Sequence, residues 1–200
     1  MTANSHHKKL ILASASPRRL DLLGQLNITP DDVIAADIDE SPNKDELPRQ
    51  IALRLAVEKA QKIREDHKDA FIIAADTVVA CGRREMPKAL NEDDARKSLT
   101  LLSGRRHHVY GGICVITPEG KTIPRLCDTV VKFKRLSPQE IEAYLNSGEW
   151  EGKAGGYAIQ GLAAGFISNI QGSYSNVVGL SLYDIMQLLS GNNFFVKTNR

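Results

Sequence analysis

Two adjacent arginines near the start of the chain lie in the segment SASPRR at residues 14–19. Ser16 is typical of a helix N-cap and Pro17 of a first helical residue. Arg18 and Arg19 are therefore predicted in the first turn, where the partial positive charge of the helix N-terminus makes each cation unfavourable by about 0.3 to 1 kcal/mol. Free backbone N–H groups, two hydroxyls and two guanidinium groups at a helix start favour a polyphosphate ligand. The alternative is that both arginines point into solvent or pair with nearby acids.

A carboxylate interrupts the apolar run FIIAADTVVAC at residues 71–81, which has the length and branching of a strand buried on both faces. Burying Asp76 in such a strand is unfavourable unless the carboxylate is paired or holds a metal ion. We interpret Asp76, with Thr77 beside it, as a metal ligand or general base at the ligand-binding end of an open α/β sheet. The alternative is that the strand has already reached the sheet edge and Asp76 only caps a turn.

A lysine and an acidic loop offer further charges. Lys59 lies on the apolar side of a helix predicted from about Pro48 to Arg64, so its ammonium group must either reach solvent or meet an anion. Glu40, in the loop IDES at residues 38–41, is a candidate second carboxylate, because Mg²⁺ is typically held by one or two carboxylates and substrate phosphates. Acidic loops are also commonly only solvated.

A glycine-rich segment at residues 152–165 contains GGYAIQG at residues 155–161, whose glycines allow close backbone approach to a ligand. The amide of Gln160 offers a donor and an acceptor to the edge of a nucleobase. Ser173, in a later Gly-Ser-Tyr turn, is a candidate for the same cleft. The alternatives are a glycine-rich hinge without a ligand and an ordinary turn.

Alternating strands and helices must position these residues. The patterns predict strands at 10–13, 71–81, 108–117, 121–135 and 166–170, helices after Pro17 and at 48–64, 92–102, 137–148 and 181–190, and loops at 29–48, 82–90 and 171–176. The strands around the turn at 117–120 form a hairpin, so the sheet is mixed and the domain is α/β or α+β. His107 and His108 suggest no catalytic triad and are interpreted as surface or strand-end residues.

Composition narrows the class of protein. The chain has 200 residues with 42% hydrophobic and 25% charged side chains, typical of one globular domain or of two small lobes that share a core. We predict a single domain over residues 1–200, with an ordered core of about residues 8–190 and loose ends. The net charge of +2 is too small to bind nucleic acid or an anionic membrane by electrostatic attraction alone. Three widely spaced cysteines and the lack of a membrane-length apolar run predict a cytoplasmic protein.

Seven segments resemble the Maf family of nucleoside triphosphate pyrophosphatases, over about Leu10 to Leu189. They are LASASPRR (12–19), IDES (38–41), RLAVEKA (54–60), AADTVV (74–79), LLSGRRHHV (101–109), GKAGGYAIQG (152–161) and GSYSNVVGL (172–180). The resemblance implies an inosine-triphosphate-pyrophosphatase-like α/β fold, with a mixed twisted sheet flanked by helices and a cleft between two lobes. It also implies a cytoplasmic, often dimeric protein that uses a divalent metal, Mg²⁺ or Mn²⁺, to hydrolyse a nucleoside triphosphate to the monophosphate and pyrophosphate.

The resemblance also assigns roles to residues. Asp76 resembles the family's proton acceptor, while Glu40 and Lys59 match other catalytic residues of its cleft. Asp76 and Glu40 are the expected metal ligands. The expected substrate-binding residues are Ser14, Arg18, Arg19, Thr77, Lys88, Gln160 and Ser173.

Gln160, in YAIQG, matches the branch of the family that resembles dTTP/UTP pyrophosphatases, whereas the branch acting on 7-methyl-GTP tends to have glutamate there. An amide can pair with both a ring N–H and a carbonyl of thymine or uracil, which glutamate cannot do. A pyrimidine nucleotide is therefore the expected substrate. The alternatives are 7-methyl-GTP-type specificity and a nucleotide-binding regulator of septum formation without significant turnover.

Two positions depart from the pattern of many family members. Met86 stands where a lysine is usual, and Lys88 is the candidate to reach the same phosphate. The run HVYGG at residues 108–112 lacks a threonine hydroxyl that many members have.

Overall fold

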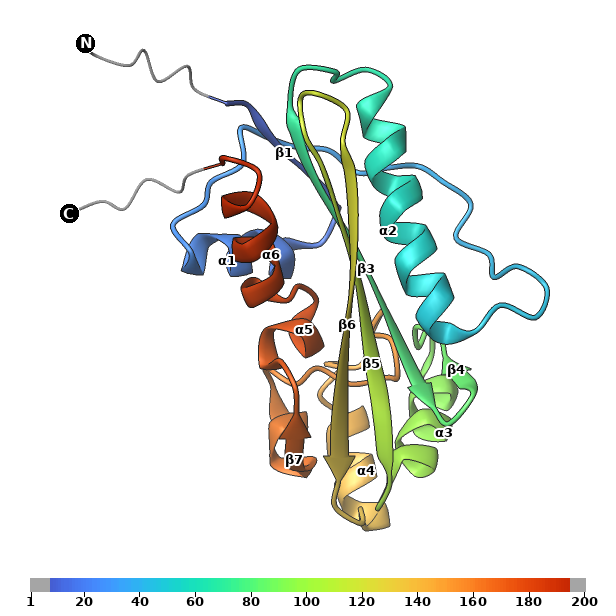
Figure 1. Ribbon diagram of the computed structural model, residues 1–200. Helices are drawn as coiled ribbons and strands as arrows, with labels where there is room; N and C mark the ends of the chain where they lie inside the picture. The colour runs from blue at the N-terminus through green and yellow to red at the C-terminus, as the bar shows by residue number, and fades with distance from the viewer. Residues whose placement is uncertain (1–7, 195–200) are drawn as a thin grey trace.

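The computed structural model describes residues 8–194. Its strands form one seven-stranded mixed sheet in the order β2-β1-β3-β5-β6-β7, with β4 paired to β3 outside this path (Figure 1). The strands are β1 (Leu10–Ala13), β2 (Asp32–Val33), β3 (Phe71–Cys81), β4 (Arg84–Met86), β5 (Arg106–Ile116), β6 (Thr122–Phe133) and β7 (Ile167–Gln171). β1 runs parallel to β2 and β3, and the other pairs are antiparallel. The predicted mixed sheet and its hairpin are confirmed.

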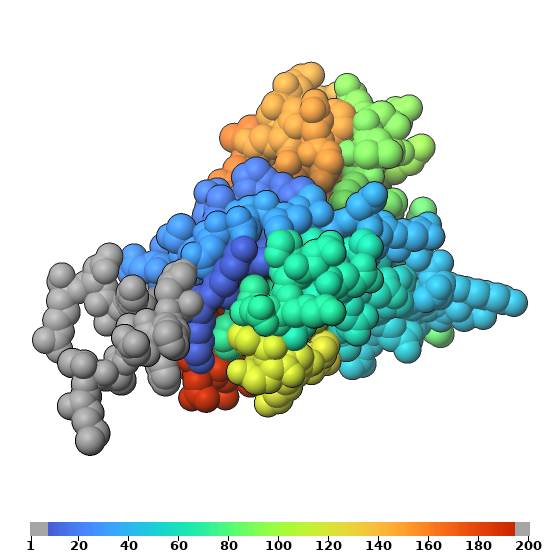
Figure 2. Space-filling view, turned by 90° about the horizontal axis from the view of Figure 1, so that it is seen from above, coloured from blue at the N-terminus to red at the C-terminus, as the bar shows by residue number. Residues whose placement is uncertain are grey.

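Helices cover the sheet on both faces. They are α1 (Pro17–Gln25), α2 (Pro48–Arg64), α3 (Glu92–Leu102), α4 (Pro138–Leu145), α5 (Tyr174–Val178), α6 (Leu182–Ser190) and the short 3-10 helix η1 (Leu162–Phe166). Figure 1 shows β4, α3, α4 and β7 at one end of the long strands and β1, α1 and α6 toward the other. The loop before α2 projects from the side of the molecule (Figure 2). Within the described part of the chain, no helix is long and apolar enough to cross a membrane.

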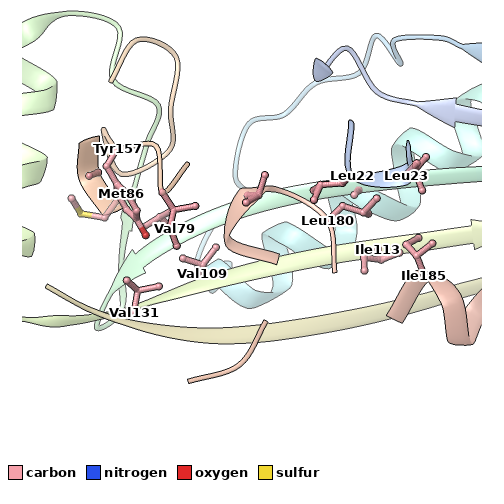
Figure 3. Packing of buried hydrophobic residues seen from close by; sticks show 14 of the residues in the cluster. Leu22, Leu23, Val79, Met86, Val109, Ile113, Val131, Tyr157, Leu180 and Ile185 are labelled. Carbon is pink, nitrogen blue, oxygen red and sulfur yellow. The ribbon is translucent and has the colours of Figure 1, made fainter. Parts of the chain in front are cut away.

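Strand β3 packs against different helices on its two faces. Alternate residues belong to the larger core, which includes side chains of α1, α3 and α6, while Ile72 and Ala74 pack against α2. Because successive side chains of a strand point to opposite faces, Asp76 shares the face of Ile72 and Ala74, and Thr77 has the opposite face. The larger core extends along the strands, with Leu22 toward one end and Tyr157 toward the other (Figure 3).

The sheet leaves a gap beside β3. β1 pairs with β3 only as far as Ala13 opposite Ala74, and β4 begins to pair at Val79. In the structure of residues 8–194, the edge of β3 at residues 75–78 therefore has no strand on this side, although β5 pairs with it on the other. Asp76 lies at this gap, close to the point where the chain leaves β1 toward α1.

Two glycines of β5 allow other elements to approach the sheet here. Gly112 is paired in register with Asp76, and a Cβ at Gly112 would lie 1.8 Å from the backbone oxygen of Ala52 in α2. A Cβ at Gly111 would lie 1.8 Å from Oδ1 of Asn176 in α5. The missing threonine therefore leaves room for the Asn176 side chain, and Gly112 lets α2 pack directly on the sheet.

Some predicted loops contain short regular elements. β2 lies within residues 29–48, β4 within 82–90, and α5 begins before the predicted loop at 171–176 ends. Elements this short show neither alternation nor a helical period in the sequence. In the predicted loose end starting at Gly191, the ring of Phe194 packs edge-on against Phe71. The rest of the predicted loose ends, 1–7 and 195–200, lies outside the described residues.

His107 is fully buried, so it is not a surface residue, although it lies at a strand end as the second residue of β5. β5 starts earlier than predicted, and this carries His107 into the core beside the ring of Phe133. Its Nε2 is hydrogen-bonded to the hydroxyl of Tyr157 at 2.8 Å. Burial, with a smaller contribution from the neighbouring His108, lowers the pKa of His107 to about 4. His108 itself is partly exposed, with Nδ1 2.8 Å from Oδ1 of Asp128.

Candidate active site

A cleft with a volume of about 370 Å³ opens at the gap beside β3. Its walls come from the connection between β1 and α1, the loop before α2, β3, the glycine-rich segment and the end of α5. The polar and charged side chains that line it are Ser14, Ser16, Arg18, Arg19, Glu40, Lys59, Asp76, Thr77, Lys88, Lys153, Tyr157 and Gln160. The structure thus brings all the predicted site residues together except Ser173.

Lys59 joins two carboxylates in this cleft. Its Nζ lies 2.6 Å from Oδ1 of Asp76 and 2.6 Å from Oε1 of Glu40. Asp76 and Lys59 are each only 8% exposed, because Asp76 points from β3 toward α2 and Lys59 lies on the buried face of α2. Glu40 comes from the loop before α2, and its side chain is 43% exposed. The buried ammonium group therefore meets an anion, which was one of the two possibilities that the helix pattern left open.

Neighbouring charges shift the pKa values of Glu40 in the cleft and of Glu85 near it. Burial alone would raise the pKa of Glu40, but the hydrogen bond and charge of Lys59, together with the charge of Lys88, lower it overall. Glu85 has a raised pKa because it is partly buried and close to the negative charge of Asp76. Nζ of Lys88 lies 3.5 Å from Oε2 of Glu40, and its side chain is 61% exposed. Lys88 is therefore a weaker partner of Glu40 than Lys59.

Arg19 connects three parts of the cleft wall. Its Nε donates to the backbone oxygen of Gly179 at 2.9 Å, and its two terminal nitrogens donate to Oγ of Ser14 at 3.0 Å and Oγ1 of Thr77 at 3.2 Å. Burial lowers the pKa of Arg19, while the negative charge of Asp76 opposes this shift. Thr77 and Ser14 thus contact the guanidinium group and hold it between β1, β3 and the end of α5.

Arg18 differs from Arg19 because its side chain has no hydrogen bond or ion pair to another residue between 8 and 194. α1 begins at Pro17 with Ser16 as its N-cap, as predicted, so Arg18 lies in the first turn. Burial lowers the pKa of Arg18. Lys153, which no sequence pattern marks as a site residue, lines the same cleft, and its pKa is lowered by burial and by the positive charge of Arg18. Two neighbouring cations of this kind favour an anion between or beside them.

The segment that carries Lys88 is tied to the glycine-rich segment. Lys88 and Ala154 form an antiparallel bridge, and the N–H of Gly155 lies 3.1 Å from the backbone oxygen of Met86. Met86, at the position where a lysine is usual, is 5% exposed and belongs to the larger core. Its side chain therefore does not face the cleft, whereas that of Lys88 lines it.

Two tyrosines anchor the rest of the glycine-rich segment. The hydroxyl of Tyr157 is hydrogen-bonded to His107, and the hydroxyl of Tyr144 accepts a hydrogen bond from the N–H of Ala158 at 3.0 Å. Gln160 follows these anchored residues and is exposed at the cleft. The amide of Gln160 is thus presented by a backbone that is fixed on both sides of Tyr157.

Ser173 is not among the residues that line the cleft, and its contact with a substrate stays a prediction. It is the N-cap of α5, where its Oγ accepts a hydrogen bond from the N–H of Asn176. Its own N–H donates to Oγ1 of Thr129 at 3.1 Å. The other end of the same helix, at Val178 and Gly179, reaches the cleft. The sequence predicts a turn at Ser173, and in the structure this serine caps the short helix that follows.

The cleft offers oxygen donors of the kind that Mg²⁺ and Mn²⁺ prefer, in Asp76 and Glu40. Between residues 8 and 194, no three His, Cys, Asp or Glu side chains gather into a metal site. A divalent cation would therefore complete its coordination with oxygens from a ligand, as Mg²⁺ commonly does with phosphates. The donor set fits a metal that binds together with a polyphosphate.

Comparison with known proteins identifies the family of this chain. The family model described as Maf-like protein matches residues 9–192. The chain belongs to the Maf family. A relative from Paramagnetospirillum magneticum is 60% identical over 92% of this chain and 97% of its own length, and one from Mesorhizobium japonicum is 56% identical over 94% and 93%. Both of these Maf relatives are named dTTP/UTP pyrophosphatase.

A solved structure of the Ham1 protein of Staphylococcus aureus also resembles the chain. The TM-score is 0.46 and the identity 17%, over 63% of this chain and 72% of the Ham1 chain.

Proposed function

We propose that the protein is a nucleoside triphosphate pyrophosphatase that hydrolyses dTTP and UTP to the monophosphate and pyrophosphate. The observation that carries this proposal is a cleft in which a buried acid, Asp76, lies 2.6 Å from Lys59 and shares its walls with Arg18 and Lys153. These residues occur in a chain that is 56% and 60% identical to relatives named for that activity. The proposal includes a single domain over residues 1–200, a cytoplasmic location and a homodimer, as the resemblance implies.

The reaction requires a nucleophilic water and stabilisation of the departing pyrophosphate. The carboxylate of Asp76 accepts a proton from water as the water oxygen forms its bond to the α-phosphorus. The bond between the α-phosphorus and the bridging oxygen breaks, and pyrophosphate leaves with the bonding electrons. Asp76 suits this role because β3 fixes it in a buried position at the edge of the cleft. Mg²⁺ or Mn²⁺ held by Asp76 and Glu40 would supply further neutralisation of the phosphate charge when bound.

The cations have different tasks in this proposal. Arg18 and Lys153 hold phosphate oxygens, because among the described residues neither has a carboxylate partner within ion-pair distance. Arg19 lines the cleft, and its hydrogen bonds to Ser14 and Thr77 fix its orientation. Lys59 stabilises the negative charge that develops during bond cleavage, and Lys88 contributes from its exposed position.

Gln160 selects the base in this proposal. Its amide can donate to a carbonyl and accept from a ring N–H of thymine or uracil. Thr77 contributes to selection of the base only through Arg19, because its hydroxyl accepts a hydrogen bond from that guanidinium at 3.2 Å. Exchange of Gln160 for glutamate removes the donor and leaves only acceptors.

A substrate panel tests the proposal. Purified protein is incubated with Mg²⁺ and dTTP, UTP, dCTP, GTP or 7-methyl-GTP, and pyrophosphate and orthophosphate are measured separately. We expect pyrophosphate from dTTP and UTP, and a loss of about tenfold or more in kcat/KM on both for Gln160→Glu. Release of orthophosphate first would indicate a phosphatase. Binding of UTP without any product would favour a regulator of septum formation, and preference for 7-methyl-GTP would place the chain in the other branch.

A further inference from the structure

The position of Lys59 is unusual for a cleft whose two carboxylates are the expected metal ligands. Its Nζ lies 2.6 Å from one oxygen of Asp76 and 2.6 Å from one oxygen of Glu40. Two oxygens that both lie this close to one atom flank a single position. That position holds an ammonium group in the structure, and two cations cannot share it because they repel each other strongly at such a distance.

We infer that Lys59 takes the metal position of the nucleotide-free protein, so that a divalent cation binds between Asp76 and Glu40 only when a nucleotide arrives and draws the ammonium group to its phosphates. This inference rests on the proposed function, because it assumes that the reaction uses a divalent cation. It adds that the free protein holds metal weakly and that metal and nucleotide each increase the affinity for the other.

The surroundings of Lys59 permit this exchange. Asp76 is fixed on β3, whereas Lys59 carries its charge on a flexible four-carbon chain and Glu40 lies on the loop before α2 with 43% of its side chain exposed. Lys59 also lines the same cleft as Arg18 and Lys153, where the phosphates are proposed to lie. The ammonium group therefore has an alternative anion within its cleft once phosphates are present.

The competing explanation is that Lys59 is a permanent structural partner of the two acids. In that case its charge only compensates for burying Asp76, and removing it would destabilise the fold without creating a cation site. The two explanations predict opposite results for metal binding by a variant without the ammonium group.

The experiment uses Mn²⁺ alone, with nucleotide-free protein, and counts free Mn²⁺ by electron paramagnetic resonance. We expect weak binding by the wild type and binding at least about tenfold tighter by Lys59→Met, whose unbranched side chain is one atom shorter and carries no charge. Lys88→Met is the matched control, because it removes a cation that is 3.5 Å from Glu40 but largely exposed. We expect this control to change the affinity less than about threefold. The double variant Lys59→Met/Asp76→Asn should lose the tight binding.

Several outcomes would overturn the inference. If the wild type binds Mn²⁺ tightly, with the same affinity as Lys59→Met, then Lys59 does not exclude the metal. This comparison does not depend on catalytic activity. Tight binding that persists in the double variant places the ion elsewhere. If Lys59→Met does not fold, as judged by circular dichroism, Lys59→Gln is titrated in its place, and tight binding by the wild type alone still contradicts the inference. Loss of the proposed function is recognised separately, by the absence of pyrophosphate release from the wild type.

Discussion

The two walls of the cleft carry similar cations in different electrostatic states. On the wall formed by α2 and β3, Lys59 lies 2.6 Å from both Asp76 and Glu40. On the wall formed by α1 and the glycine-rich segment, the pKa of Lys153 is lowered by burial and by the charge of Arg18. A paired cation must give up its carboxylates before it binds phosphate, whereas an unpaired one is ready to do so. The wall of α2 and β3 therefore suits a chemical step that begins only after the ligand has bound. The wall of α1 and the glycine-rich segment suits binding of the ligand.

The largest effect that separates the walls is expected for Asp76→Asn. The amide cannot accept the proton of water, so we expect kcat on UTP to fall by about a thousandfold while KM changes less than about threefold. Lys59 retains Glu40 as a partner, and the melting temperature should stay within a few degrees of the wild type. Steady-state kinetics with pyrophosphate detection and thermal melts measure the two quantities.

Asp128→Asn is the control for this variant, because Asp128 is an exposed acid of β6 that pairs with His108 outside the cleft. It should leave kcat unchanged. A folded Asp76→Asn protein with full turnover would remove the catalytic role from the wall formed by α2 and β3, and the comparison between the walls would no longer hold.

The second prediction concerns the pH dependence of stability, through the buried His107 that holds Tyr157 in the other wall. Burial lowers the pKa of His107 from 6.5 to about 4, and its ring is hydrogen-bonded to Tyr157 in the glycine-rich segment. His107 takes up a proton near pH 6.5 in the unfolded chain but only near pH 4 in the folded protein. The free energy of unfolding therefore falls as the pH drops from 6.5 to 4. Below pH 4 the imidazole is protonated in both states, and its contribution no longer changes. The expected loss is about 3 kcal/mol.

Urea unfolding at pH 7, 5.5 and 4.5 measures this loss, and His107→Gln is the control because it cannot titrate. The difference in free energy of unfolding between the two proteins should shrink or reverse toward low pH. If the wild type and His107→Gln show parallel pH dependence, the buried imidazole does not control the stability of this wall.

The walls also differ in how far the sequence predicts them. Asp76 and Lys59 stand out because each is a charge within a long periodic apolar pattern, β3 or α2, and a buried charge in such a pattern needs a partner. That Lys59 lies between two acids was not predictable, since it depends on where the loop of Glu40 returns to the sheet. Lys153 has no such pattern, because charged residues in a glycine-rich loop are ordinarily solvated.

The elements of the fold likewise differ in whether the sequence predicts them. The hairpin of β5 and β6 and helix α2 are long enough for their periods to be visible, and the sequence predicts them. β4 spans Arg84–Met86 and exists because it pairs with the end of β3, and α5 is a short helix capped by Ser173. Tertiary pairing determines both, so a local pattern does not reveal them. The burial of His107 likewise follows from the register of β5 rather than from its own residue type.

The smallest effect, and the one that tests the capturing wall directly, is expected for Lys153→Met. The ammonium group donates to the backbone oxygen of Glu151 at 3.0 Å and is next to the charge of Arg18, so its removal leaves the acid of the other wall untouched. We expect KM for UTP to rise about tenfold and kcat to change less than about threefold, because a single phosphate contact made before and during the reaction contributes mainly to binding. Lys132→Met, on the exposed side of β6, is the matched control and should leave both constants unchanged. A fall in kcat for Lys153→Met comparable to that of Asp76→Asn would mean that both walls take part in the chemical step, since a residue that only captures the phosphates cannot slow bond cleavage once the substrate is bound.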